Sequence, residues 1–300
     1  MSRPWSILAL VVLSAASVPV ASPAHAQQPV AIDTRATSEA LFHLALEARR
    51  RGDERFAANV LERVVRLDPQ AVLPRLEWGE ALMSLHEPDL VEALLAPVEA
   101  RVEMEAGERP DSAARFYRIR ASAAARSGRE DDALALYERA IGFSPYDLGL
   151  RGLVISMYRS RRDSVAAAGH LVAAASLRPD DPDLRVEAGR ALLTVGRFED
   201  AELEFRVALR IDLYAVPAWK GLSEALAGQE RWSDAEEVLR GGLQLAPDSA
   251  SLHELLGDAL LAGGRVKEAL VWYTRAAALE GADAPALERK IERVRARLAP

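Results

Sequence analysis

Apolar and charged residues follow one another at helical spacing through residues 196–213, GRFEDAELEFRVALRIDL. Ala201 and Ala208 lie seven positions apart, so both fall on one face of an amphipathic helix. The same pattern returns 34 residues later in ERWSDAEEVLRGGLQLAP (230–247) and again in GRVKEALVWYTRAAALEG (264–281). A fixed period of this length indicates a chain built from repeated structural units.

Three earlier windows, 52–69, 128–145 and 162–179, share this frame. All six windows carry alanine at the sixth place: Ala57, Ala133, Ala167, Ala201, Ala235 and Ala269. A weaker copy with Val91 at that place is followed by an insertion of eight residues near 105–112. A second amphipathic stretch precedes each window, so each unit is expected to form two helices joined by a short turn.

Glycine and proline mark the boundaries of these predicted helices. Gly52, Gly128, Gly196 and Gly264 lie between the two helices of their units, where a helix end favours a residue with positive φ. Proline ends the second helix of four units, at Pro69, Pro145, Pro179 and Pro247. Small residues recur at the eighth and twentieth places of the units, where we expect two helices to approach closely.

The 34-residue unit resembles the tetratricopeptide repeat, whose pattern is W-x2-L-G-x2-Y, then A-x3-F, then P. Trp219 and Leu222 in WKGLSEAL match its first part, and seven such units span residues 38–283. The resemblance implies an all-α, right-handed superhelical solenoid of helix-turn-helix units. In that family the first helix of each unit lines a concave groove that binds protein partners.

The C-terminal end of this repeat array and one region inside it differ from the pattern. Residues 284–300 carry Leu287, Ile291, Val294 and Leu298 on one helix face, which predicts a C-terminal capping helix. Residues 88–113 are expected to be irregular, because Pro97 breaks the second helix of its unit and the insertion follows. Arg120 also stands where an apolar residue is usual.

The first 26 residues have the features of a secretory signal peptide. Arg3 is their only charged residue, an apolar run follows, and SPAHA ends them with a small-x-small site. We expect cleavage after Ala26 and a periplasmic or secreted protein, with residues 27–37 as an N-terminal extension. The alternative is an uncleaved anchor, but the apolar run is shorter than the roughly 20 residues that cross a bilayer.

Composition and motifs argue against several classes of function. The formal net charge is −7, or −8 once Arg3 is removed, whereas nucleic-acid-binding proteins have a basic footprint. Cysteine is absent, and His43, His86, His170 and His253 fall in different units without metal-ligand spacing. We find no phosphate-binding loop and no catalytic set of residues, so no enzyme, cofactor or metal is expected.

The groove places of the first helices divide into three zones. The N-terminal apolar zone is Phe42, Leu46, Leu73, Leu76 and Met83. The basic zone is Arg115, Arg118, Arg126, Arg159 and Arg190, followed by Lys220. The acidic end is Glu224, Glu254 and Asp258. Asparagine is absent from these places, so the carboxylate clamp of the family's co-chaperones is not supported.

These zones predict a non-enzymatic scaffold of the periplasm or cell envelope that binds partner peptide segments, in envelope-complex assembly or in secretion. The basic zone is either a cradle for an acidic peptide or an ordinary solvated face. The apolar zone favours contact with a partner, unless the segment QQPVAIDT (27–34) folds back over it. The alternative function is a structural protein that forms a homodimer through this apolar zone.

Overall fold

The computed structural model describes residues 34–298, so the predicted signal peptide and residues 27–33 of the N-terminal extension lie outside the described residues. Within residues 34–298 the regular elements are all helical. In chain order they are α2 (Thr34–Arg50), α3 (Glu54–Leu67), α4 (Val72–Ser84), α5 (Asp89–Leu95), the 3₁₀ helix η2 (Ala96–Val98), α6 (Glu99–Glu105), α7 (Pro110–Arg126), α8 (Glu130–Phe143), α9 (Leu148–Ser160), α10 (Ser164–Leu177), α11 (Pro182–Thr194), α12 (Phe198–Ile211), α13 (Val216–Gly228), α14 (Trp232–Leu245), α15 (Ala250–Ala262), α16 (Val266–Ala277) and α17 (Ala284–Leu298).

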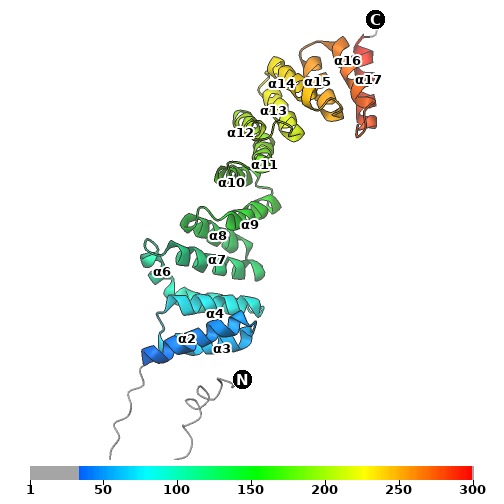
Figure 1. Cartoon of the computed structure of the whole chain (residues 1–300). Coiled ribbons are helices and arrows are strands. Elements are labelled where there is room, and N and C mark those ends of the chain that lie inside the picture. Colours follow the sequence, from blue (N-terminus) through cyan, green and yellow to red (C-terminus); the bar gives the residue numbers. More distant parts are fainter. Residues whose placement is uncertain (1–33, 299–300) are drawn as a thin grey trace, which may run out of the picture.

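The helices form an all-α solenoid in which each helix packs against the next along the chain. The stack is elongated and curved, with α2 at one end and α17 at the other (Figure 1). Seven units, each a first helix followed by a second helical segment, run from α2 to α16. One amphipathic pair cannot bury its apolar face alone, so this stacking supplies the core.

The turn inside each unit contains one residue in the left-handed region. Four units use Gly52, Gly128, Gly196 and Gly264, with φ between 73° and 80°. The prediction for these glycines is therefore confirmed. The other three units place His86, Arg162 and Glu230 at the same turn with φ near 60°. A side chain is strained in this conformation, so the helical pairing of these units holds the turn in shape.

Small residues allow the helices to approach closely, as the repeat pattern predicts. The ring of Phe205 on α12 is fully buried between Gly189 on α11 and Gly221 on α13. A Cβ atom at Gly189 would lie 2.8 Å from that ring, and one at Gly221 would lie 2.2 Å from it. Tyr273 on α16 approaches Gly257 on α15 in the same way, at 2.6 Å. These contacts confirm that glycine makes room for aromatic core residues.

The second unit is irregular. Its second half is divided into α5, η2 and α6, and Pro97 lies in the 3₁₀ turn between the two short helices. The break at Pro97 is therefore confirmed. Arg120, on α7, contacts both short helices of this divided segment. Its guanidinium binds Glu92 of α5 at 2.6 and 3.0 Å and Glu99 of α6 at 2.8 Å. These ion pairs explain why a charged residue is stable where an apolar one is usual.

The C-terminal helix α17 covers the last repeat. Leu287, Ile291 and Val294 are buried against the preceding helices, as the predicted face requires. Leu298, at the end of this helix, is 37% exposed, so its predicted place in the buried face is wrong. The helix ends there, and no following turn covers this side chain within the described residues.

The apolar core is divided near the middle of the chain. One large cluster of buried residues joins α4 to α9, and another joins α10 to α17. Between them lies a small cluster of Ile155, Leu171, Ala175 and Ala188, from α9, α10 and α11. Helix α10, SVAAAGHLVAAASL, is rich in alanine and therefore brings less apolar volume into this junction than its neighbours do.

Candidate functional site

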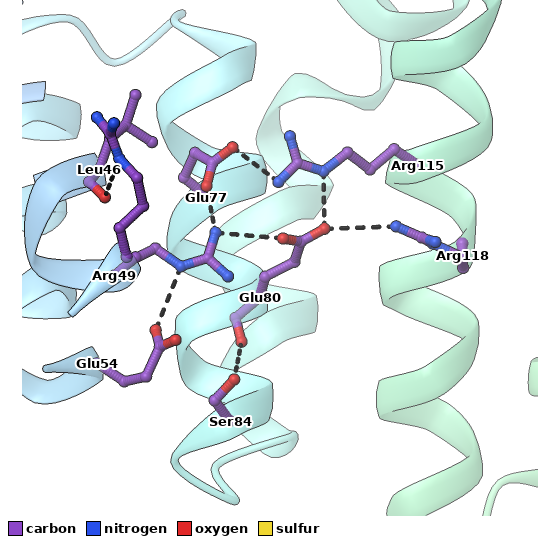
Figure 2. A network of polar contacts seen from close by, with 9 residues as sticks. Leu46, Arg49, Glu54, Glu77, Glu80, Ser84, Arg115 and Arg118 are labelled. Atoms are coloured by element: carbon purple, nitrogen blue, oxygen red, sulfur yellow. Dashed lines mark hydrogen bonds and ion pairs between the residues drawn. The ribbon is translucent and has the colours of Figure 1, made fainter. Parts of the chain in front are cut away.

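Acidic residues of α4 hold the N-terminal part of the groove together. Glu77 and Glu80 accept bonds from Arg49 of α2 and from Arg115 of α7 (Figure 2). Arg115 donates from Nε to Glu80 at 2.7 Å and from Nη2 to Glu77 at 2.8 Å. Arg118 reaches Glu80 at 3.5 Å. This network links the first helices of three successive units.

The network neutralises arginines that the sequence assigns to a free basic zone. Burial raises the pKa of the Glu80 carboxyl, but the bonds and charges of Arg115 and Arg49 outweigh it and hold this pKa below its ordinary value. Arg115 is mainly stabilised in its charged form by its bond to Glu80, which raises its pKa. The basic zone is therefore not continuous, because Arg115 and Arg118 are already paired with carboxylates of the chain.

The other predicted groove residues of the first three units differ in how far they are exposed. Leu76 is 1% exposed in the cluster that contains Val91 and Leu95, so the prediction that it lines an open groove is wrong. Arg126 donates to the Met83 carbonyl at 2.7 Å. Several predicted residues are partly buried: Phe42, Leu46 and Met83.

The apolar zone opens into a cavity at the N-terminal end of the solenoid. Leu73 is 48% exposed there, and it lines this cavity of about 630 Å³ together with Phe42. Val64 and Leu67 of α3 contribute further apolar wall.

Two of the three residues of the predicted acidic end bind the capping helix. Lys290 of α17 binds Glu254 at 2.7 Å and Asp258 at 2.8 Å. The Tyr273 hydroxyl also donates to Asp258, at 2.7 Å. The charges of Glu254 and Asp258 therefore fasten the cap to the last unit.

Two further predicted groove residues form a weaker pair within one helix. Lys220 and Glu224 lie 3.9 Å apart on α13, and both are partly exposed. An exposed pair at this distance contributes little to stability, so both side chains remain available to a partner.

Two of the predicted arginines, Arg159 and Arg190, line an open hollow formed by α9, α10 and α11. Two adjoining cavities there, of about 390 and 420 Å³, share Arg159, Leu171 and Glu187 in their walls. We call them together the central cleft. Arg159 of α9 binds Glu187 of α11 at 2.6 Å across it. Arg190 also lines the cleft and has no ion pair or hydrogen bond from its side chain among the described residues.

The central cleft combines apolar walls with excess positive charge. Its apolar lining comes mainly from Ile155, Ala167, Leu171, Ala174, Leu184 and Ala191. Its ionisable lining residues are Arg159, Arg178, Arg190 and Glu187, three cations and one anion. Arg178 has a distant partner, Asp181, at 3.7 Å. The cleft is therefore electropositive in a protein whose net charge is negative.

Sequence reasoning missed the acidic partners in these surfaces. Glu77 and Glu80 lie three positions apart on α4, so they share a helix face, and this spacing was visible in the sequence. Glu187 of the central cleft was missed as well. Its pairing with Arg159 depends on how two successive units are offset in space, which the sequence pattern does not specify.

The described residues contain neither a candidate metal-ligand group nor a membrane-spanning helix. Residues 34–298 contain no group of three His, Asp or Glu side chains placed to hold a metal ion. The only ion pair of a histidine found in that range joins His170 to Glu138, at 2.9 Å. No helix in the same range is long and apolar enough to cross a membrane.

The fold and these surfaces define a helical-repeat solenoid with an open, partly charged surface. The sequence matches the model of the tetratricopeptide repeat family over residues 76–147, 158–215 and 221–285. These matches cover more than half of the chain, which therefore belongs to the tetratricopeptide repeat family. The family prediction is confirmed.

Several solved structures are similar to this chain, and the one with a TM-score above 0.5 supports the fold. A chain in the structure of Naa15/Naa10 bound to HypK-THB is similar over 86% of this chain, with a TM-score of 0.67 and 14% identity. This chain spans only 39% of that one. MamA from Desulfovibrio magneticus RS-1 is similar over 56% of this chain and 94% of its own, at 20% identity and a TM-score of 0.43. A tetratricopeptide repeat protein from Parabacteroides merdae matches over 87% of this chain and 99% of its own, at 13% identity and a TM-score of 0.44. A search of curated proteins finds no match to this sequence.

Proposed function

We propose that the mature protein is a non-enzymatic interaction scaffold of the bacterial periplasm or cell envelope. It binds segments of partner proteins on the surface of its first helices, in the assembly of an envelope complex or in secretion. Tetratricopeptide repeat proteins generally are non-enzymatic interaction scaffolds, which supports this role. The observation that carries the proposal is the central cleft, where apolar walls lie beside the unpaired Arg190.

Site-specific photocrosslinking in cells tests this proposal. A photoreactive amino acid replaces Thr194, which lines the central cleft, and Leu203, which is 62% exposed on the second helix α12, in a matched control. The proposal predicts a discrete crosslinked protein from position 194 and none, or a different set, from position 203. Crosslinking that is absent at 194, or identical at both positions, contradicts it.

The proposed location rests on the N-terminal sequence pattern and has its own test. The full-length chain is expressed in a Gram-negative host and the periplasmic fraction is collected by osmotic shock. We expect the mature chain in that fraction, with Gln27 as its first residue. A chain that keeps residues 1–26 and stays with the cytoplasm contradicts export but leaves the scaffold role intact.

A second candidate function is self-association through the N-terminal apolar zone. The cavity of about 630 Å³ beside the exposed Leu73 favours it, since exposed apolar patches usually mark contacts. Sedimentation equilibrium of the mature protein at several concentrations tests it, with Leu73→Glu as the disrupting variant. A dimer that Leu73→Glu dissociates supports this function, and a monomer at every concentration contradicts it.

A further inference from the structure

The second helix begins with an aromatic residue in the fifth and sixth units, but not in the fourth unit, which forms part of the central cleft. Phe198 and Trp232 are the first residues of α12 and α14. The corresponding first residue of α10, 34 positions before Phe198, is Ser164. The fourth unit therefore lacks the aromatic side chain that its two successors carry.

The cavity beside the small Ser164 side chain is larger than the cavity at the equivalent place beside Trp232. The Phe198 ring lies so close to Gly228 that a Cβ atom there would be 2.4 Å from it. Ser164 and Thr194, the residues at the equivalent places one unit earlier, instead line the cavity of about 420 Å³. The cavity beside Trp232 holds only about 50 Å³. Ser164 therefore leaves open a space that phenylalanine or tryptophan closes in the next two units.

The space is large enough for part of a ligand. Pockets that hold small ligands measure about 300–1,000 Å³, and each half of the central cleft, at about 390 and 420 Å³, falls in that range. The space beside Ser164 is bounded by Ala167, Leu171 and Ala191. An aliphatic side chain placed there would bury apolar surface against these residues.

The charges around this space favour a carboxylate. Arg190 has no partner of its own among residues 34–298, and Arg159 already binds one carboxylate, that of Glu187. Arg159 and Arg190 line the same cavity, so an incoming carboxylate can accept from Arg190 and compete with Glu187 for Arg159. The chain itself thus shows how an acidic group is held in this cleft.

We propose that the central cleft binds an acidic peptide segment in which an aliphatic side chain lies next to a carboxylate. The aliphatic side chain occupies the space beside Ser164, and the carboxylate accepts hydrogen bonds from Arg190 and Arg159. This inference rests on the proposed scaffold function and names the chemistry of its partner. Three helices form the floor and walls, which suits an extended peptide better than a flat membrane surface.

Selection of peptides on the purified mature protein tests the inference. A library of random twelve-residue peptides displayed on phage is selected against the wild-type protein. The affinity of the selected peptide, made synthetically with a fluorescent label, is then measured by fluorescence anisotropy. We expect a selected sequence with an aspartate or glutamate beside a leucine, isoleucine or valine.

Three variants and a control make the test specific. Ser164→Phe copies the residue of the next unit at the same helix position and should weaken binding at least tenfold by filling the cleft. Arg190→Glu should weaken it by a similar factor, because it replaces the free cation by an anion. Glu187→Gln should strengthen binding severalfold, because it releases Arg159 from its internal carboxylate. Arg210→Glu, on the exposed surface of α12, should leave the affinity unchanged.

Several results would overturn the inference. They are failure to select any peptide, selected peptides without an acidic residue, equal affinity for Ser164→Phe and wild type, and weaker binding by Glu187→Gln. Circular dichroism of each variant shows whether its fold is intact, and the gain expected for Glu187→Gln cannot come from unfolding. A partner that crosslinks to position 194 while the selected peptides lack acidic residues would preserve the scaffold function and refute only this inference.

Discussion

The packing of Phe205 gives the sharpest test of how the repeats stack. Replacing Gly221 by alanine adds a Cβ atom 2.2 Å from the Phe205 ring, far inside van der Waals contact. The ring has little room to move, because it is fully buried and a Cβ at Gly189 would lie only 2.8 Å from it as well. The added methyl group must therefore push α13 away from α12.

The expected cost follows from two opposing effects. Overpacking a filled core costs about 1–3 kcal/mol, and the upper end applies here because the fully buried ring already lies close to both glycines. Alanine is about 1 kcal/mol more favourable than glycine inside a helix, which offsets part of this cost. We therefore expect Gly221→Ala to lower the free energy of unfolding by about 2 kcal/mol.

Urea unfolding followed by circular dichroism measures this change, with Gly169→Ala as the matched control. Gly169 lies inside α10, and a Cβ there meets nothing within 4 Å, so only the helix-forming effect remains. The control should gain about 0.5–1 kcal/mol. Replacing the ring by the smaller leucine side chain in the double variant Gly221→Ala, Phe205→Leu should recover part of the unfolding free energy lost in Gly221→Ala. If Gly221→Ala is as stable as the control, the close packing described here is wrong.

Three further predictions concern charge and backbone conformation. Arg115→Ala removes two short bonds from a side chain that is 24% exposed and should lower the free energy of unfolding by about 2 kcal/mol. The Arg118 side chain is 46% exposed and has one contact at 3.5 Å, so Arg118→Ala should lower it by less than about 0.5 kcal/mol. Equal effects of the two substitutions in urea unfolding would contradict the network. Because the folded pKa of Glu80 lies below its ordinary value of 4.5, its contribution is present above that pH and is lost as the pH falls through the folded pKa. Glu80→Gln should therefore flatten the loss of stability as the pH falls below about 4.5, and an unchanged pH profile would refute this sign. Arg162→Gly relieves a side chain at φ 60° and should raise the free energy of unfolding by about 0.5–1 kcal/mol, so a thermal midpoint below that of wild type would argue against strain in this turn.

Most of the fold could be predicted because its determinants are local and periodic. The turn glycines, the small residues facing aromatic rings and the break at Pro97 each act within one unit or between neighbours. A period of 34 residues repeats these constraints, so one sequence is enough to reveal them. The burial of Leu76 escaped prediction because the divided second helix of its unit changes what packs over α4.

The candidate site was only partly predictable, since it depends on pairing between units. Arg115 and Arg190 look alike in the sequence, yet one is paired with Glu77 and Glu80 and the other has no partner in residues 34–298. One half of the central cleft is lined by Ser164, where the next two units carry an aromatic residue. Comparing Ser164 with Phe198 and Trp232 in the next two units points to this difference, although α8 and α16 also begin without an aromatic residue.

Hydrogen exchange tests the central claim, that the cleft formed by α9, α10 and α11 is where a partner segment binds. Amide exchange of the mature protein is measured with and without a saturating concentration of the selected peptide. Binding there predicts slower exchange in residues 148–194 and little change in residues 216–262, where the equivalent cavity is closed by Trp232. Protection confined to 216–262, with none in 148–194, would contradict it.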